Sequence, residues 1–550
     1  MSAQVRQRLD PLTGAAAGAG LVLLAVLAWR ASDVIALVTA NSDLAAPLVM
    51  GDVAHRYDDA QLVGRLGWWG GLWVVQLLRP LPGSEGLSTW LPFVATLAVA
   101  GLVAWQARAL WGRLAGAVVL LVTLSAGAVT WVHLASWSAR SPSWWAMGLA
   151  GVLAVAVARA ADRPPVGRRR AALAAAAVLV ALAIAMVASG DELAVAGAIV
   201  PLAAAGAFAA SRRRLLLGAL LGGGAVLTFG LALAIAQLAE AAGYLRQDYP
   251  LQLVAFTDLP LTVANLVLGV TRVWSDATTL GTLAGLLGLA LVTAAVVAGA
   301  RALWRAGAAP PAEAAPIAGG VWLAFWLTAL VVLLAVFVPT TASGALGDPV
   351  VRYLHGVPLA AAAVLAACTG ASPRARALPA AATVLALLTA LSLAVDPPKP
   401  APPGADVSRA EVFGEVERMA REEGVTRGFA SYWTSYPLAI HAGRELDVTP
   451  IGRCGEELCP MYLHYVDQAY AEQPGIRSFV LVDTSPLAAG GHAGAWATVW
   501  PKRMKPVKVY DVGGGVQMGI FDHDAARDLV PNGGNDDPRA GHGGPLEPLS

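Results

Sequence analysis

The chain has 550 residues, of which 57% are hydrophobic and 14% charged, and its mean hydropathy is +0.61. In a soluble globular domain about a quarter of the residues are charged. This composition therefore excludes an ordinary soluble protein and requires a lipid bilayer. The formal net charge is +1, so no overall field attracts nucleic acid, and we expect no nucleic-acid partner.

About eleven apolar segments approach the roughly twenty residues that a helix needs to cross a membrane. They lie at 14-38, 89-107, 114-135, 143-160, 171-188, 193-210, 215-239, 278-300, 317-338, 357-371 and 379-395. The first follows Arg6 and Arg8 but continues to Ala40 without a clear cleavage site, so we expect a retained helix and not a signal peptide. The sequence predicts a polytopic α-helical membrane protein.

Basic residues occupy every second connection between these segments. They are Arg108, Arg113, Arg159, Arg163, Arg168 to Arg170, Arg212 to Arg214, Arg301, Arg305, Arg374 and Arg376. Arg-rich loops stay in the cytoplasm, which predicts a cytoplasmic N-terminus. Acidic residues gather in the other connections, and an odd number of spans then exports everything after about Val395. The Ala and Gly excess and the preference for Arg over Lys are typical of a high-GC bacterial genome, which indicates a bacterial plasma membrane.

A Pro-rich linker at 396-406 separates the membrane part, 1-395, from the C-terminal part. Outer-face loops are expected at 41-88, 240-277 and 339-356. In 407-523, helical periodicity is followed by the strand-like runs VTRGFASYW and RSFVLVD and by a hairpin around Gly513 to Gly515. We predict a small extracytoplasmic α/β domain there, and a disordered tail over 524-550, which is rich in Gly, Pro, Asn and Asp.

Two of the three cysteines, Cys454 and Cys459, lie in the segment CGEELC. A loop can bring them within bonding distance, and a disulfide requires an oxidising compartment, which agrees with an exported domain. Two free thiols are the alternative. A zinc site normally has four ligands, and only His464 lies near. Cys368 lies in an apolar run and is expected to behave as a small buried hydrophobe.

The first outer loop holds the candidate catalytic acids. Asp43 directly follows the first span, so its carboxylate is expected near the headgroups, where it can accept a proton from an acceptor hydroxyl. Asp52 is the second candidate. For both, the structural alternative is a charge that only marks the interface. The segment GWWGGLW (67-73) is too short to span and is expected at the interface, where it either anchors the chain or shapes a groove for a lipid carrier.

Other outer connections supply candidate pocket residues. HLASWSARSPSWW (133-145) places Trp137 and Arg140 at the outer ends of two spans, and SGDE (189-192) puts Asp191 and Glu192 in a tight turn, where polar residues can be purely structural. The second half of the connection from Glu240 to Asp276 is amphipathic enough to lie along the membrane surface.

The last outer loop, DPVVRYLHG (348-356), places Arg352 immediately before a span, with Tyr353 and His355 beside it. A guanidinium group at the outer boundary breaks the inside-positive pattern and can pair with a phosphate through two charge-assisted hydrogen bonds. We therefore expect a phosphate-binding site here. Simple snorkelling of the side chain to the interface is the alternative.

These features together resemble the GT-C class of integral membrane glycosyltransferases in bacteria. The resemblance in layout covers the whole chain: one span, an acidic outer loop, a many-helix bundle, an RYL segment before a late span, and an exported C-terminal domain. In motif it covers short stretches, such as ASYWTSYPLAIHAGRELDVTP (430-450), which is similar to the YW...YP...SG element of many bacterial members and adds Tyr432 and Trp433 to the expected substrate pocket.

The resemblance implies a chemistry. Such enzymes transfer a sugar from a polyprenyl-phosphate carrier to an extracytoplasmic cell-envelope glycan or lipid, with inversion, and an aspartate of the first outer loop acts as base. Asp43, or else Asp52, would take that role, and Arg352, Tyr353 and His355 would bind the carrier phosphate. The first loop has no DxD motif, so a divalent metal is not indicated but stays an alternative, and the sequence specifies no other cofactor. The alternatives are a transporter or lipid flippase, which predicts charges at mid-membrane depth, and a non-catalytic envelope scaffold.

Overall fold

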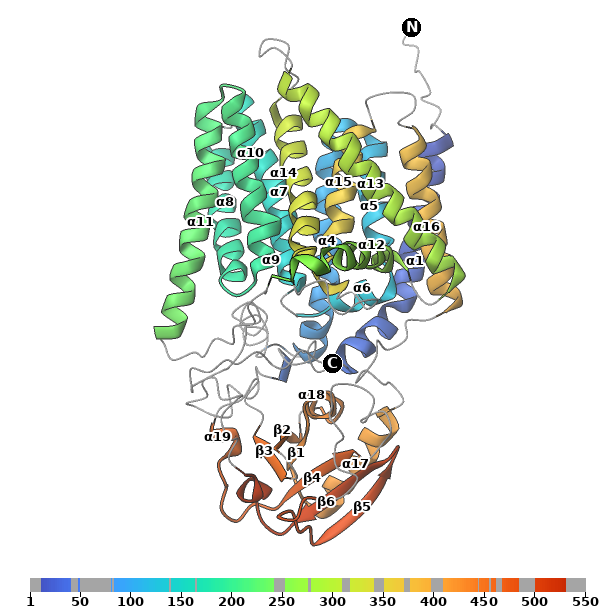
Figure 1. Ribbon diagram of the computed structural model, residues 1–550, viewed down its shortest axis with the longest axis vertical. Coiled ribbons are helices and arrows are strands. Elements are labelled where there is room, and N and C mark those ends of the chain that lie inside the picture. Colours follow the sequence, from blue (N-terminus) through green and yellow to red (C-terminus); the bar gives the residue numbers. More distant parts are fainter. Residues whose placement is uncertain are drawn as a thin grey trace.

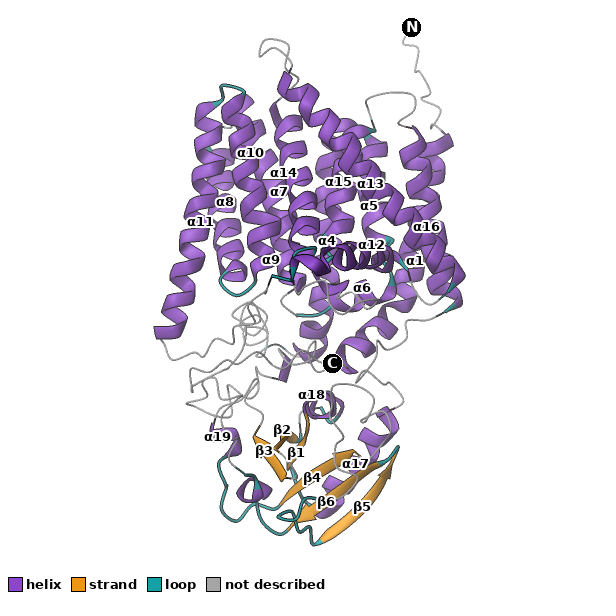
Figure 2. Cartoon of the chain, in the orientation of Figure 1, coloured by secondary structure: helices purple, strands orange, loops and turns teal. Residues whose placement is uncertain are grey.

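The structure is a computed structural model that describes residues 11–40, 48–49, 81, 84–137, 140–163, 166–241, 253–275, 278–308, 317–340, 351–369, 376–396, 409–443, 445–454, 457–460, 467–483 and 500–530. These residues form a bundle of helices with a mixed α/β domain at one end (Figure 1). Strands occur only in that domain, apart from an isolated bridge between Leu253 and Thr340, among the residues described (Figure 2).

The long helices of the bundle run roughly along the long axis of the molecule (Figure 1). They are α1 (Pro11–Ala40), α4 (Ser84–Trp111), α5 (Arg113–Leu124), α7 (Arg140–Asp162), α8 (Arg168–Ala188), α10 (Val200–Ser211), α11 (Leu215–Ala241), α13 (Thr279–Ala308), α14 (Ile317–Phe337), α15 (Val357–Cys368) and α16 (Ala377–Val395). Within the described ranges, nine helices are long and apolar enough to cross a membrane, or ten if one bent pair counts as a single span. The prediction of a polytopic helical membrane protein is confirmed.

Two of the predicted spans have a different form. The segment 114-135 is not one straight helix, because α5 and α6 (Ala128–Leu134) meet at 95°. The N–H of Gly127, at the bend, donates to the carbonyl of Val273 over 2.8 Å, and Thr130 donates to the same carbonyl over 3.0 Å. The segment 357-371 contains only the twelve-residue helix α15, whose apolar side chains are buried in the middle of the bundle.

The arginines that were predicted to share one side of the membrane meet at one end of the bundle. Arg159 donates to the carbonyl of Ala109, Arg212 donates to the carbonyl of Gly307, and Arg214 lies 3.5 Å from Asp162. These contacts join the ends of α4, α7 and α13 to the turn between α10 and α11, and the α/β domain lies at the opposite end (Figure 1). The basic connections that these contacts describe therefore lie at one end of the bundle, as their alternation along the sequence predicted.

Helix α12 (Leu259–Trp274) lies across the bundle helices near the end that carries the α/β domain (Figure 1). It follows the short helix η2 (Phe256–Asp258) and packs mainly on α13. Leu261, Val263 and Val267 are exposed, whereas Thr262 and Asn265 are buried. The exposed face of α12 is therefore apolar, and its position along the membrane surface stays a prediction.

The α/β domain has a six-stranded sheet with the order β3-β2-β1-β4-β6-β5. Its elements are α17 (Arg409–Glu423), β1 (Arg427–Ser431), α18 (Tyr432–His441), β2 (Asp447–Cys454), β3 (Glu457–Pro460), α19 (Asp467–Tyr470), β4 (Ser478–Asp483), β5 (Lys508–Gly513), β6 (Val516–Phe521) and η7 (Ala525–Asp528). Strand β1 is parallel to β2 and β4, and the other pairs are antiparallel. Strands β5 and β6 form the hairpin predicted at Gly513 to Gly515, where all three glycines have positive φ.

The first residues of the predicted disordered tail belong to this domain. Asp524 is fully buried and lies 3.0 Å from Nε of Arg427 in β1, and it accepts the N–H groups of Gln473 and Ala526. The N–H of Val530 donates to a carbonyl of β3 over 2.9 Å. The prediction that disorder begins at residue 524 is therefore wrong for 524–530, because a buried ion pair and ordered backbone hydrogen bonds offset the unfavourable composition. Residues 531–550 lie outside the described part.

The domain contacts the bundle through a small apolar cluster. Leu48 and Trp137 are buried there, and Leu91, Trp145 and Ile440 pack against them. Ile440 belongs to α18, which also contacts α1. The domain therefore packs directly against the bundle through α18, at the bundle end opposite the arginine turns.

Candidate functional site

The segment RYLHG forms a compact junction between η5 (Val351–Tyr353) and α15. Leu354 is buried and donates its N–H to the carbonyl of Val351 over 2.8 Å, and a proline in the first turn starts α15. Gly356 allows the junction to lie close to its neighbours, because a Cβ there would be 2.7 Å from Cδ1 of Leu333 and 3.3 Å from Cε of Met147. The close fit fixes the positions of Arg352, Tyr353 and His355.

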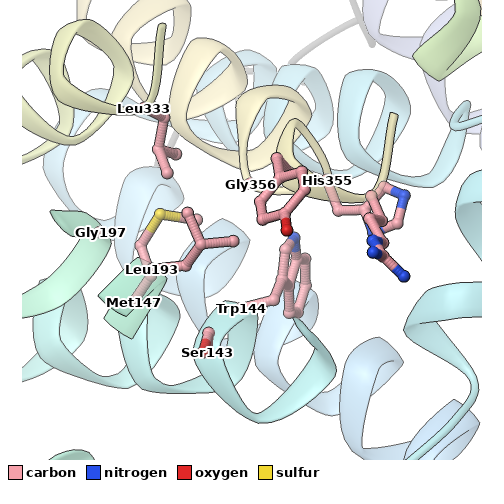
Figure 3. A pocket seen from close by; sticks show the side chains of 10 residues that line it. Ser143, Trp144, Met147, Leu193, Gly197, Leu333, His355 and Gly356 are labelled. Atoms are coloured by element: carbon pink, nitrogen blue, oxygen red, sulfur yellow. The ribbon is translucent and has the colours of Figure 1, made fainter. Parts of the chain in front are cut away.

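A pocket of about 20 Å³ lies beside this junction. It is lined by Ser143, Trp144 and Met147 of α7, Leu193 of α9 (Glu192–Ala194), Gly197 of η1 (Val195–Ile199), Leu333 of α14, and Arg352, Tyr353, His355 and Gly356 (Figure 3). A water molecule needs about 10 to 15 Å³, so the pocket holds one or two water-sized groups. The three residues predicted to bind phosphate therefore line one pocket.

The tight turn SGDE lies directly before Leu193, which lines the pocket. Asp191 is 1% exposed and accepts a hydrogen bond from Ser143, and its other oxygen accepts the N–H of Leu193 over 3.1 Å at the start of α9. The helix then passes through the π turn η1, in which Gly197 lies against Met147. Single π turns occur frequently at functional sites. A buried carboxylate thus holds the wall formed by α7 and α9.

Two histidines stack at the other side of the junction. The rings of His133 and His355 have centroids 4.8 Å apart and an interplanar angle of 36°. His133 belongs to α6, and its carbonyl accepts hydrogen bonds from the hydroxyls of Ser136 and Ser141. The bend between α5 and α6 therefore brings the side chain of His133 to the edge of the site. His133 and His355 are 222 positions apart in sequence.

The other predicted pocket residues lie elsewhere or outside the described residues. Trp137 is buried in the cluster that contacts the α/β domain and donates its indole N–H to the carbonyl of Ser88 over 2.7 Å. Glu192 is exposed. The structure does not describe Asp43, Asp52 or the side chains of Arg140, Tyr432 and Trp433. Their roles stay predictions.

Ser143 and Trp144 line the pocket but were not singled out from the sequence. They lie in the segment HLASWSARSPSWW, one turn inside α7, whereas Trp137 precedes that helix. Helical spacing from Arg140 would have placed position 144 on the same face one turn later. The start of α7 was the missing information, because 143-160 was expected to be the helix.

The cysteine pair lies on a hairpin of the α/β domain. Strands β2 and β3 are antiparallel, with Gly452 opposite Cys459 and Cys454 opposite Glu457. The two cysteines are therefore on neighbouring strands, two positions from direct pairing. The disulfide stays a prediction. Among the described residues, no group of three His, Cys, Asp or Glu side chains is placed to bind a metal ion.

Fold and site define a multi-pass helical membrane protein with a small pocket, lined by apolar side chains and by Arg352, Tyr353 and His355, near the bundle end that carries an α/β domain. Neither a protein-family model nor a curated protein matches the sequence. Among solved structures, the crystal structure of ArnT from Cupriavidus metallidurans in the apo state is similar, with 13% sequence identity over 94% of this chain and 100% of that chain and a TM-score of 0.40. The likeness is one of layout, and no residue role is taken from it.

Proposed function

We propose that the protein is a GT-C-type membrane glycosyltransferase that moves a sugar from a polyprenyl-phosphate carrier to an extracytoplasmic cell-envelope acceptor. The observation that carries the proposal is the convergence of Arg352, Tyr353 and His355 on one pocket at the domain end of the bundle. A guanidinium group in a pocket with apolar walls is a strong partner for a phosphate, because its hydrogen bonds are charge-assisted and little water competes for them.

The reaction assigns a task to each group. The oxygen of the acceptor hydroxyl bonds to the anomeric carbon of the sugar, and the bond from that carbon to the carrier phosphate breaks with its electron pair left on the phosphate oxygen. Arg352 stabilises this developing charge. The hydroxyl proton goes to a carboxylate of the first outer loop, Asp43 as first choice and Asp52 as second. Attack opposite the leaving group inverts the anomeric centre.

The membrane surface of the bundle suits a donor with a long apolar tail. The tail stays in lipid along the exposed face of α12, which carries Leu261, Val263 and Val267, while the phosphosugar reaches the pocket. Positive-inside orientation supports placing the arginine end in the cytoplasm and the α/β domain outside. In that compartment a disulfide between Cys454 and Cys459 can form.

The test uses purified full-length protein in lipid nanodiscs with a panel of radiolabelled polyprenyl-phosphate sugars and envelope acceptors. We expect Asp43→Asn to abolish transfer while the protein still folds and inserts, and Arg352→Gln to reduce the rate about 10²- to 10³-fold, as for loss of one donor to a developing anion. Asp258→Asn, an exposed acid at η2, is the matched control. Full activity in Asp43→Asn would refute the assigned base.

Transport or lipid flipping is the second candidate, because a broken span favours it. Discontinuous helices are a feature of many transporters, and α5 and α6 form such a break. A proteoliposome assay with a fluorescent polyprenyl-phosphate lipid separates the two functions. Movement of the lipid between leaflets without sugar transfer would support transport, and a protein that does neither would fit an envelope scaffold.

A further inference from the structure

Trp144 places a hydrogen-bond donor in the wall of the pocket that the proposed reaction does not use. The residue is 2% exposed, and its indole Nε1 has no hydrogen-bond acceptor within the described ranges of the chain. Other buried indoles of the bundle do have acceptors; Trp131, Trp137, Trp274 and Trp322 donate to backbone carbonyls. A buried N–H without a partner costs free energy, and such groups need an explanation.

Trp326 is a second buried indole whose Nε1 has no acceptor among the described residues. It belongs to α14, where its ring packs against Phe325 and against the backbone of Gly151. It does not line the pocket. Trp144 and Trp326 therefore each have a buried indole N–H without an acceptor among the described residues, but only Trp144 lines the pocket. This difference makes Trp326 a matched control.

The pocket beside Trp144 has the composition of an oxyanion site. The nitrogen edge of the indole faces away from Ser143 (Figure 3). Arg352 supplies positive charge to the same pocket, and Met147 and Leu333 supply apolar walls that strengthen any hydrogen bond made inside it. A volume of about 20 Å³ admits a group the size of one oxygen atom and excludes a sugar ring.

We propose that the indole N–H of Trp144 donates a hydrogen bond to one non-bridging oxygen of the phosphate that Arg352 binds. That oxygen occupies the small pocket, while the rest of the phosphate and the sugar stay at its mouth. Trp144 is neutral at every pH, so it adds direction without adding charge. The inference rests on the proposed function only for the identity of the carrier, because the hydrogen-bond donors of Trp144 and Arg352 suit a phosphate whatever group it carries.

The first measurement is the affinity of full-length protein in nanodiscs for undecaprenyl phosphate, with undecaprenol as the ligand that lacks the phosphate. Loss of one hydrogen bond to a charged group corresponds to about a 10- to 100-fold loss of affinity. We expect this loss in Trp144→Phe and wild-type affinity in Trp326→Phe. Without ligand, the melting temperature of each variant should fall only as far as the replacement of the indole by the smaller phenyl ring explains. No hydrogen bond is lost, since each variant removes an unsatisfied donor.

Inorganic phosphate distinguishes this inference from the proposed function. If wild type binds undecaprenyl phosphate and Trp144→Phe binds it equally well, the Trp144 subsite is refuted and the glycosyltransferase proposal stands. If wild type binds only inorganic phosphate, and Trp144→Phe loses that binding, the subsite stands and the polyprenyl carrier is refuted. If wild type binds neither ligand, the subsite is refuted.

A second measurement reads the response in wild-type protein and needs a folded Trp144 variant only to assign the resonance. In wild-type protein with ¹⁵N-labelled tryptophan, the indole N–H resonance of Trp144 should move downfield when phosphate binds, and that of Trp326 should not. The resonances are assigned by their loss in Trp144→Phe or Trp144→Tyr and in Trp326→Phe. An unmoved Trp144 resonance at saturating ligand would overturn the inference.

Discussion

Replacing Gly356 by alanine tests whether the close fit of the RYLHG junction positions the three residues proposed to bind phosphate. The backbone of Gly356 has φ −73° and ψ −21°, which any residue adopts. The effect of a Cβ is therefore steric: it would lie 2.7 Å from Cδ1 of Leu333 and 3.3 Å from Cε of Met147. Both are ends of flexible side chains that line the pocket, and overpacking of this kind costs about 1 to 3 kcal/mol.

We expect Gly356→Ala to lower the melting temperature in detergent and to weaken binding of the donor, because Leu333 and Met147 must move into or away from the pocket. The control is Gly319→Ala in α14, where a Cβ would lie at an ordinary 3.7 Å from Trp111, so that helix propensity should stabilise it slightly. The assays are thermal unfolding and the KM for the polyprenyl-phosphate sugar. Unchanged stability together with unchanged donor KM in Gly356→Ala would refute the packing argument.

Two further predictions concern residues away from the pocket. Arg30→Met removes hydrogen bonds of 2.9 Å to two carbonyls in the last turn of α16, and should lower stability by about 1.5 to 3 kcal/mol; a wild-type melting temperature in detergent would contradict this. Hydrogen bonds from Lys508, Tyr510 and Arg477 hold the pKa of Glu423 at about 2. The stabilisation from these three hydrogen bonds is present above the ordinary pKa of 4.5 and is lost as the pH falls toward 2. The difference in the free energy of unfolding between wild type and Glu423→Gln should therefore shrink below pH 4.5. A difference that stays constant down to pH 3 would contradict this prediction.

The sequence predicted most of the bundle because the bilayer imposes strong rules on it. Each apolar segment had to satisfy its own backbone hydrogen bonds, and the arginine turns had to share one end. The bend between α5 and α6 was not predictable in this way, because 114-135 contains no Asp, Glu, Lys, Arg or Pro. Its cause is tertiary: Gly127 and Thr130 donate to Val273, and Thr389 donates to the carbonyl of Ser125 over 3.0 Å.

The candidate site was predicted where unusual residue types mark it and missed where they do not. Arg352 was recognisable because its guanidinium group lies immediately before a span on the acidic side of the alternation. Trp137 and Trp144 were not distinguishable by type, since tryptophan suits both an interface and a pocket. The pair formed by Ser143 and Asp191 joins positions 48 residues apart, and neither residue predicts the other without the packing of α7 against α9.

Helix α12 and the pocket at the RYLHG junction are connected through helix α6. The carbonyl of Val273, at the end of α12, accepts two hydrogen bonds from the start of α6, and α6 carries His133, whose ring stacks on His355. Helix α12 also contacts η5, which carries Arg352. Helix α12 is therefore linked by hydrogen bonds and packing contacts to both sides of the RYLHG junction. Under the proposed function, lipid against the apolar outer face of α12 would help to set the geometry in which Arg352 meets the carrier phosphate.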